Sequence, residues 1–428
     1  MALTKAVTRN PWAWVPTLYF GEGLPYVIAM QVSTVMYKNL GISNADIALY
    51  TSLLYLPWVV KPVWSPVVDL LKTKRYWIIA MQLTVSVALA CVGLAIPLSF
   101  FFAATIAVLW LMAFSGATHD IAADGFYMLG LDEGTQATFV GVRSTFYRIA
   151  MLTGQGGLVI VAGYFQTSGG ITFGWSVAFF IVAALFFLLF LYHRFMLPYP
   201  VADVQKSEAG PSHFLGEFFK TFGSFFQKKG ILLSLGFLLL FRLNESQIIK
   251  LIAPFLLDAR SNGGLGLSTS QVGIAYGTFG VIGLMAGGIA GGVAIARNGL
   301  RFWLIPMMLV IHIPDLVYIT LSHIQPGNFP MICGCVGLEQ FAYGFGFAAY
   351  TMYMIKIAEG EHKTAHFAIC TGIMALGMMV PGMFAGELQE LLGYKTFFLT
   401  VLGSLLPALL IVLSLKIDPE FGMKKSAT

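Results

Sequence analysis

Residues 114–128 read FSGATHDIAADGFYM and continue a long apolar run, yet they contain His119, Asp120 and Asp124 within six residues. Asp120 and Asp124 are four residues apart, so on a helix both carboxylates project from one face, with His119 beside them. A carboxylate at the middle of a bilayer costs about 2.5–3.5 kcal/mol on insertion scales, so two of them are poorly tolerated on a lipid-facing surface. We therefore expect them to face a protein interior or a water-filled cavity.

The composition is that of a membrane protein. Of 428 residues, 57% are hydrophobic and 11% are charged, and the mean hydropathy is +0.79, whereas soluble domains carry about 25% charged residues. The net charge of +5 gives no reason to expect a nucleic-acid partner. We also expect no metal site and no cofactor, because the four cysteines lie in or beside apolar runs without other ligands. No phosphate loop is present, which argues against ATP coupling.

Hydropathy predicts an all-α polytopic membrane protein with twelve transmembrane helices, each long enough to cross a bilayer. One long polar interruption, residues 196–230, separates an N-terminal six-helix half (1–195) from a C-terminal six-helix half (231–428). The predicted spans are 14–37, 46–68, 77–97, 101–127, 137–164, 174–195, 231–257, 269–293, 302–322, 329–356, 364–390 and 394–416.

The basic residues predict the orientation of these spans. If both termini are cytoplasmic, seventeen of the 25 lysines and arginines fall on the inner side and five lie within spans. Only Lys38, Arg260 and Lys395 fall on the outer side. This asymmetry follows the positive-inside rule, so we expect both termini in the cytoplasm.

A short internal repeat supports the division into two related halves. LGISNADIALYTS at 40–52 is similar to LGLSTSQVGIAYGT at 265–278, and each follows a span that contains a glutamate, Glu22 or Glu245. Two related halves joined by a cytoplasmic linker are typical of secondary transporters, which bind substrate near the midplane between the halves. Chance similarity of two glycine-containing loops is the alternative.

The carboxylates within the predicted spans are candidates for carrying a coupled proton, because their pKa can change with solvent access and neighbouring charge. The alternative is architectural: Asp120 or Asp124 pairs with Arg143 or Arg148 and ties helices together. The proton-coupling candidates are Asp124 and Glu22, which we prefer, followed by Asp120, Glu245 and Glu339.

Polar and aromatic residues near these carboxylates are candidates for substrate binding, because aromatic faces pack against sugar rings while polar groups fix hydroxyls. Asp69 and Arg75, at the end of the second span and the start of the third, predict either a gating salt bridge or a static helix-end contact. The glycines of 277–292 predict close helix approach rather than phosphate binding. The substrate-binding candidates are Tyr26, His119, Tyr147, Arg148, Arg242, Gln340 and Tyr343.

These motifs resemble the AmpG-like branch of the major facilitator superfamily, which also contains the acetyl-coenzyme A transporters. The resemblance rests on GEGLPY (21–26), KPVWSP (61–66) followed by Asp69, HDIAADGF (119–126), the Tyr147–Arg148 pair and LEQFAYGFGFAAY (338–350). It implies alternating access and proton coupling in a multi-pass protein of the bacterial inner membrane. AmpG-like proteins import GlcNAc-anhydroMurNAc, with or without peptide, for peptidoglycan recycling. One departure is His119, where the family commonly has glutamine.

We therefore expect a monomeric, proton-coupled symporter, not an enzyme, whose partners are a small-molecule substrate, protons and membrane lipid. The expected substrate is a muropeptide or related amino-sugar oligosaccharide. An acyl-coenzyme A or other anionic metabolite transporter is the closest rival, because Arg143, Arg148, Arg242 and Lys250 would suit phosphates. A polytopic membrane acyltransferase that uses His119 and Asp124 as base and partner is a second alternative.

Overall fold

The computed structural model describes residues 9–203, 220–360 and 362–423, and within these ranges it contains helices and no strand. The helices up to residue 203 are α1 (Val15–Val27), α2 (Ser33–Asn39), α3 (Asn44–Leu53), α4 (Leu56–Leu71), α5 (Lys74–Ala95), α6 (Phe101–Gly130), α7 (Glu133–Met151) and α8 (Val159–Met196). Those after residue 230 are α10 (Ile231–Leu240), α11 (Leu243–Leu257), α12 (Thr269–Val272), α13 (Val281–Val310), α14 (Ile313–Ile324), α15 (Phe329–Ala358), α16 (Lys363–Leu402) and α17 (Leu405–Ser414).

Six helical stretches of the described chain are long and apolar enough to cross a membrane. Three of them run for 63, 56 and 50 residues, more than twice the roughly 20 residues that one crossing needs. Each contains a glycine with positive φ, at Gly170, Gly299 or Gly393, where the backbone leaves the helical conformation. The fold is thus all-helical and polytopic as expected, and the count of twelve crossings stays a prediction.

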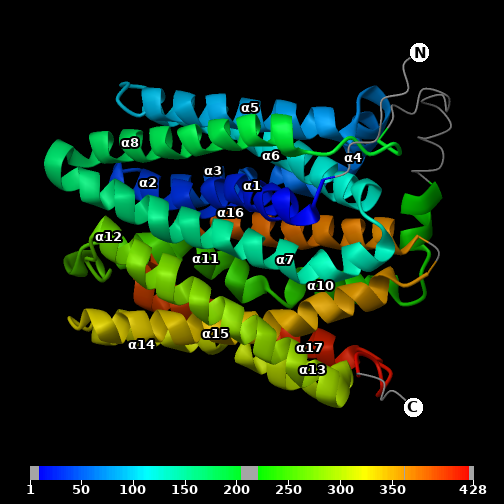
Figure 1. The fold of residues 1–428 in the computed structure, drawn as a ribbon. Coiled ribbons are helices and arrows are strands. Elements are labelled where there is room, and N and C mark those ends of the chain that lie inside the picture. Colours follow the sequence, from blue (N-terminus) through cyan, green and yellow to red (C-terminus); the bar gives the residue numbers. More distant parts are fainter. Residues whose placement is uncertain (1–8, 204–219, 361, 424–428) are drawn as a thin grey trace. The chain divides into compact units, whose positions relative to one another are not determined.

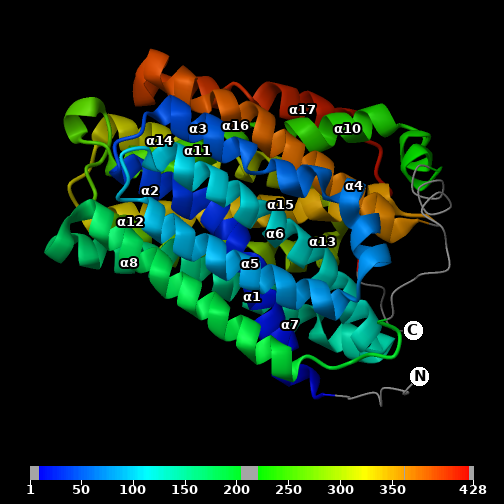
Figure 2. The same cartoon turned by 90° about the horizontal axis from the view of Figure 1, so that it is seen from above.

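The chain groups into two compact units. The first comprises Met1–Ser33 and Val60–Glu217, and the second comprises Thr34–Val59 and Phe218–Thr428. Contacts therefore group the segment 34–59, which contains α2 and α3, with the C-terminal half. Figures 1 and 2 both show α5 beside α6 and α8 in the first unit.

Close approach of α1 and α7 is a defining contact of the first unit. A Cβ on Gly23 would lie 3.0 Å from the carbonyl oxygen of Tyr147, and one on Gly154 would lie 2.7 Å from Cγ1 of Val27. Both helices continue into short π-helical segments, η2 (Ile28–Val32) and η3 (Leu152–Leu158). Such segments are frequent at functional sites. Here η2 follows α1, the helix that carries Glu22, and η3 follows α7.

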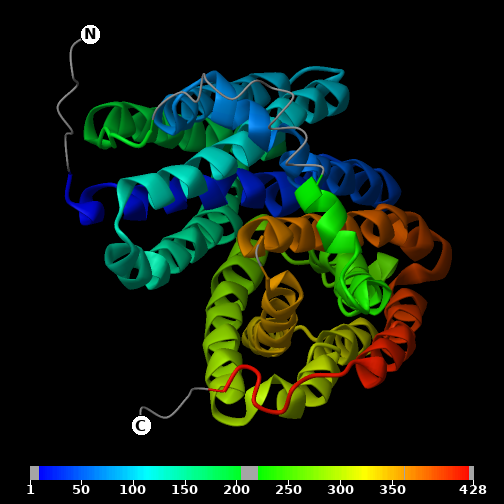
Figure 3. The ribbon, with the colours of Figure 1, turned by 90° about the vertical axis from the view of Figure 1, so that its right-hand side faces the viewer.

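In the second unit α15 lies inside a ring of other helices, as the end-on view of Figure 3 shows. It packs tightly on α13, where a Cβ on Gly283 or Gly287 would overlap the carbonyl oxygen of Gly337 or Phe341. A Cβ on Gly344 of α15 would in turn overlap the carbonyl oxygen of Leu284. The predicted role of these glycines in close helix approach is confirmed.

The two repeat loops share their local structure as well as their sequence. Ser43 caps α3 by accepting a hydrogen bond from the backbone N–H of Asp46, and Ser268 caps α12 in the same way with Gln271. Each serine follows a glycine with positive φ, Gly41 or Gly266. Serine accepts well at the first position of a helix, and glycine tolerates the left-handed turn before it. This agreement argues against a chance similarity.

The described ends of the predicted linker dock on different units. On the N-terminal side, the carboxylate of Asp203 accepts hydrogen bonds from the backbone N–H groups of Lys74 and Arg75 at 2.7 and 3.0 Å. On the C-terminal side, Nζ of Lys228 donates to the carbonyl oxygens of Ile357 and Glu359. Burial lowers the pKa of Lys228. Residues 204–219 of the predicted linker lie outside the described residues.

We predict that Gly287→Ala lowers the thermal unfolding midpoint of the purified protein, because its methyl group overlaps the backbone of α15 and overpacking costs about 1–3 kcal/mol. Gly292→Ala is the matched control, since nothing lies within 4 Å of a Cβ there. Alanine favours a helix over glycine by about 1 kcal/mol, so the control should be neutral or stabilised. Equal shifts for the two variants would contradict the close packing of α13 on α15.

Candidate functional site

The two aspartates of α6 each form an ion pair with a cation from a neighbouring helix of the first unit. Nζ of Lys61, on α4, lies 2.5 Å from Oδ2 of Asp120. Nη2 of Arg143, on α7, lies 2.6 Å from Oδ1 of Asp124. The four-residue spacing thus places both carboxylates against neighbouring helices, with the Asp120 side chain 13% exposed and that of Asp124 41% exposed. The architectural reading of Asp124 with Arg143 describes a pair that the structure contains.

Two tyrosines surround the Asp124–Arg143 pair. The Tyr19 hydroxyl donates to Oδ1 of Asp124 at 3.1 Å, and the Arg143 guanidinium lies 4.3 Å from the centre of the Tyr19 ring. The Tyr127 ring centre lies 5.1 Å from the same guanidinium. Cation–π contacts of this kind stabilise a partly desolvated guanidinium. The pair is therefore fixed from three helices: α1, α6 and α7.

Glu22 adds a third carboxyl group to this cluster. It is 9% exposed, and its Oε2 atom has no hydrogen-bond partner among the residues that the structure describes. Its carboxyl group lies beside that of Asp124 and within hydrogen-bond reach of that of Asp120. A hydrogen bond between two carboxyl groups requires a proton on one of them. We call Glu22, Lys61, Asp120, Asp124 and Arg143 the carboxylate cluster.

The carboxylate cluster contains three acids and two bases. Lys61 and Arg143 each neutralise one aspartate, and among the described residues no cation forms an ion pair with Glu22. In a low-dielectric interior an uncompensated charge is costly, and a buried acid avoids this cost by holding its proton. One exchangeable proton, shared between Glu22 and Asp120, would make the cluster neutral.

His119 contacts Gln82, whereas its neighbour Asp120 accepts a hydrogen bond from Lys61. His119 is 2% exposed, and its Nε2 atom lies 3.0 Å from Nε2 of Gln82. Gln82 contacts Nδ1 of His193, whose Nε2 lies 2.9 Å from the Thr17 hydroxyl. This chain of hydrogen bonds joins α1, α5, α6 and α8.

The remaining predicted residues of the first unit lie on α1 and α7. Tyr147 packs against Gly23 and has Tyr26 and Glu22 as electrostatic neighbours. Arg148 follows Tyr147 in α7 and is one of its electrostatic neighbours. The structure therefore brings Tyr26 and Tyr147 to Glu22.

Arg242, Glu245 and Tyr343 form a compact group in the second unit. Arg242 donates to both carboxylate oxygens of Glu245, at 2.7 and 2.8 Å, and to the Tyr343 hydroxyl at 2.7 Å. Its guanidinium also lies 4.7 Å from the centre of the Phe347 ring. Such bidentate contacts use most of the donors that an arginine offers.

Two further buried carboxylates of the second unit, those of Glu339 and Asp315, accept hydrogen bonds from neutral donors. Glu339 accepts hydrogen bonds from the Tyr318 hydroxyl at 3.2 Å and from the Gln340 amide at 2.8 Å. Asp315 accepts one from the Asn244 amide at 3.1 Å. Gln340, predicted to bind substrate, thus contacts Glu339, predicted to carry a proton.

Of the two residues predicted to form a gate, Asp69 and Arg75, the structure describes the side chain of Arg75. The Arg75 guanidinium donates to the carbonyl oxygens of Arg194 and Leu197 and lies 3.9 Å from the centre of the Tyr199 ring. It therefore anchors the chain that leaves α8. The side chain of Asp69 lies outside the described residues.

A polar network joins the segment 34–59 to the rest of the second unit, where Figure 2 shows α3 beside α11 and α16. Nζ of Lys38 lies 2.7 Å from Asp258 and donates to Oδ1 of Asn44 at 2.8 Å. The Asn44 amide donates to Gln389 at 2.6 Å and to the Tyr394 hydroxyl at 3.0 Å, and Tyr394 donates to Asp258 at 2.7 Å. We call these five residues the Asn44 network.

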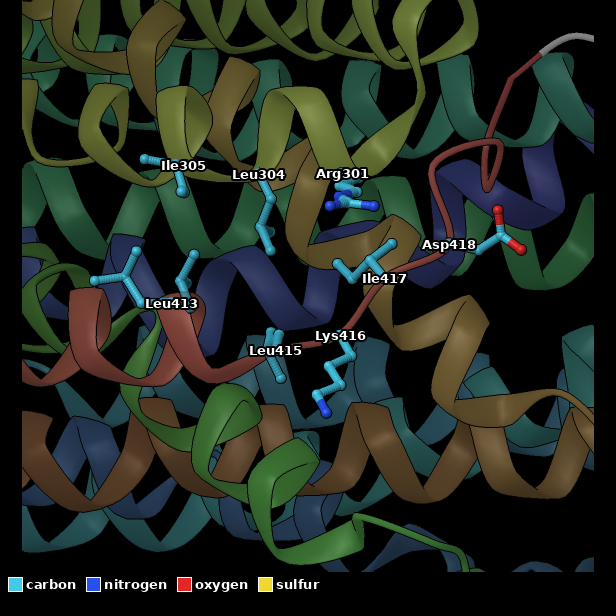
Figure 4. Close-up of a pocket in the computed structure, with 9 residues that line it drawn as sticks. Arg301, Leu304, Ile305, Leu413, Leu415, Lys416, Ile417 and Asp418 are labelled. Atoms are coloured by element: carbon cyan, nitrogen blue, oxygen red, sulfur yellow. The ribbon is translucent and has the colours of Figure 1, made fainter.

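A cavity of about 570 Å³ lies away from all of these residues, between α13, α17 and the chain that follows α17. Figure 4 shows aliphatic side chains around it, together with the charged residues Arg301, Lys416 and Asp418. None of the predicted site residues lines it.

Sequence reasoning identified the acids of the carboxylate cluster but did not assign a role to Lys61, Tyr19, Gln82 or His193. Lys61 carried a signal, since it is a cation inside a predicted span. Gln82 and His193 are single polar residues within spans, and only the packing of α5 against α8 brings them together.

The fold and its buried ionisable groups define a class, that of polytopic membrane transporters. Over 95% of this chain and all of the other, the structure matches a point mutant of the nucleoside transporter NupG with a TM-score of 0.68 at 16% identity. "Putative transporter AmpG 4" of Rickettsia conorii is 25% identical over 406 residues, 92% of this chain and 94% of that protein. The "Anhydromuropeptide permease" of Escherichia coli K12 is 23% identical over 404 residues, 92% of this chain and 78% of that protein.

The sequence profile of the BT1 family matches residues 22–256, more than half of the chain. The protein therefore belongs to the BT1 family. The resemblance to AmpG-like permeases of the major facilitator superfamily is confirmed, and the chain is a multi-pass inner-membrane transporter of small molecules rather than an enzyme.

The Lys61–Asp120 pair gives a double-mutant prediction. Lys61→Met or Asp120→Asn alone should lower stability by roughly 3 kcal/mol, because each leaves a largely buried charge without its partner. The double variant should lose less than the more harmful single variant, because no charge remains. The midpoint of thermal unfolding of purified protein measures this. Strictly additive losses would show that the two groups do not interact. The control is Lys72→Met at an exposed position, which should change the unfolding midpoint little.

Proposed function

We propose that this protein is a proton-coupled importer of a muropeptide or related amino-sugar oligosaccharide, working by alternating access with both termini in the cytoplasm. The observation that carries proton coupling is the carboxylate cluster, in which three acids face two bases. Glu22 is the group that takes up and releases the proton, because it alone of the three acids lacks a cation.

The cluster links protonation to conformation through charge balance. With a proton on Glu22, the group is neutral and tolerates a closed, dry interior. Without it, one net negative charge remains, and this charge is tolerated only where water or a cation reaches it. A proton therefore enters from one side, is carried in the closed state and leaves when the other side opens. Glu22 sits at the Gly23–Tyr147 contact of α1 and α7, where a movement of either helix changes its surroundings.

The proposed substrate rests on relatives and on side-chain chemistry. Similar proteins are named as AmpG transporters and as an anhydromuropeptide permease. Tyrosines lie beside buried polar groups in both units, around Glu22 in the first and around Arg242 in the second. Aromatic faces with neighbouring hydrogen-bonding groups suit sugar rings with hydroxyl and amide substituents.

The two alternatives have less support. Two of the cations that would suit the phosphates of an acyl-coenzyme A are occupied, Arg143 by Asp124 and Arg242 by Glu245. For acyl transfer, His119 would have to pair with Asp124. The hydrogen bonds described for them run instead from His119 to Gln82 and from Arg143 to Asp124.

We predict that Glu22→Gln abolishes accumulation of GlcNAc-anhydroMurNAc driven by an imposed pH gradient in proteoliposomes. Exchange of labelled for unlabelled substrate without a gradient should persist, because glutamine mimics the neutral, protonated acid. A drop of at least about tenfold in accumulation is expected, since driven uptake needs the proton to leave.

The control for this experiment is Glu387→Gln, which removes a carboxylate from an exposed position of α16. It should accumulate substrate like the unmodified protein. Gradient-driven accumulation by Glu22→Gln at the unmodified rate would remove Glu22 from the coupling role. Loss of exchange as well as accumulation would indicate a structural role instead.

A further inference from the structure

Lys250 is a buried cation without an anionic partner. Its side chain, on α11, is 1% exposed, and its Nζ atom donates to the Thr51 hydroxyl at 3.1 Å and lies 5.0 Å from the centre of the Tyr55 ring. No carboxylate in the part of the chain that the structure describes lies within ion-pair distance of it. An ammonium group has three N–H donors, and one hydrogen bond from that of Lys250 is made to the described residues.

A second unsatisfied polar group lies next to Lys250. The Ser52 hydroxyl is buried and has no hydrogen-bond partner among the described residues. A Cβ on Gly382 of α16 would lie 2.8 Å from that hydroxyl and 3.5 Å from Cγ of Lys250. Glycine at this position therefore allows α16 to pack closely against both groups.

Lys250 differs in its partners from Arg242, the residue that precedes α11 and lies about two helical turns away. Arg242 is neutralised by two hydrogen bonds to Glu245 and a third to Tyr343. A lone ammonium at membrane depth is costly, and intramembrane ionisable residues usually line substrate or ion pathways. Among the described residues, Lys250 therefore differs from Arg242 in having no carboxylate at ion-pair distance.

Access to Lys250 depends on the segment 34–59. Thr51, Ser52 and Tyr55, which cover it, all belong to this segment, and the Asn44 network holds the segment on α11 and α16. In an alternating-access cycle, release of this network would uncover Lys250. Its closure would shield a bound anion from water and strengthen the interaction.

We propose that Lys250 binds an anionic oxygen group of the transported solute, a carboxylate or a phosphate. This inference rests on the proposed transport function. It adds that the transported solute carries a negative charge. The Ser52 hydroxyl, which has no hydrogen-bond partner among the described residues, donates a further hydrogen bond to the same anion. GlcNAc-anhydroMurNAc carries one carboxylate and meets this condition.

Calorimetric titration of the purified full chain tests the proposal with three probes: GlcNAc-anhydroMurNAc, its methyl ester and acetyl-coenzyme A. The unmodified protein should bind the acid at least about tenfold more tightly than the ester, the worth of one charge-assisted hydrogen bond. Lys250→Met should weaken the acid to the level of the ester and leave the ester unchanged. Lys250→Arg should retain the preference. Lys250-dependent binding of acetyl-coenzyme A instead would support the site with phosphate as the anion.

An acid-to-ester ratio that is the same in the unmodified protein and in Lys250→Met would overturn the proposal while leaving transport of the sugar intact. Failure of the unmodified protein to bind either sugar or acetyl-coenzyme A would overturn the proposed function itself, and this inference with it. The unfolding midpoint is an independent readout, because removing an unpaired buried charge should leave it equal or higher. A clear decrease for Lys250→Met would show that the charge has a partner and contradict the proposal.

Discussion

Charge balance inside a low-dielectric helix bundle is the constraint on which this structure depends. Three carboxyl groups and two cations meet in the first unit, at ion-pair distances of 2.5 and 2.6 Å for Asp120 and Asp124. The third acid, Glu22, is buried with one oxygen unpartnered. Because a charge without compensation is expensive there, the number of protons and the number of ion pairs are tied together. That link is what a proton-driven transporter needs.

In the second unit the buried charges have other kinds of partner. Arg242 and Glu245 neutralise each other, while Glu339 and Asp315 are held by tyrosine and amide donors. Lys250 is a buried cation with no carboxylate at ion-pair distance among the described residues. Glu22 in the first unit is thus an acid, and Lys250 in the second unit a base, for which the described residues form no ion pair. A proton and an anionic solute would satisfy them respectively.

Helix packing gives these charges fixed positions. Glycines allow α13 to approach the backbone of α15, and Gly23 and Gly154 allow α1 to approach α7. The second contact sets the place of Glu22 next to Tyr147 and the aspartates of α6. Small residues at such contacts are typical of membrane helices, which gain little from apolar burial in lipid.

Much of this could be predicted from the sequence, because it depends on local spacing. Two aspartates four residues apart must share a helix face, and the serines and glycines of the repeat set the same turn in both halves. The pairing of Asp120 with Lys61 could not be predicted, because it depends on how α4 packs on α6. The same holds for Lys250, whose lack of a carboxylate is visible only once α3 is seen to cover it. Side-chain types give candidates, and tertiary packing decides which of them meet.

The central claim is that the carboxylate cluster holds one exchangeable proton, centred on Glu22. Infrared difference spectroscopy of the purified protein between acidic and alkaline pH detects a protonated carboxyl group by its carbonyl stretch. The account predicts a band in the unmodified protein that is absent in Glu22→Gln and retained in Glu387→Gln, whereas any band from buried Glu339 or Asp315 is the same in all three proteins. A spectrum without a titrating protonated carboxyl band, or one that Glu22→Gln leaves unchanged, would contradict it.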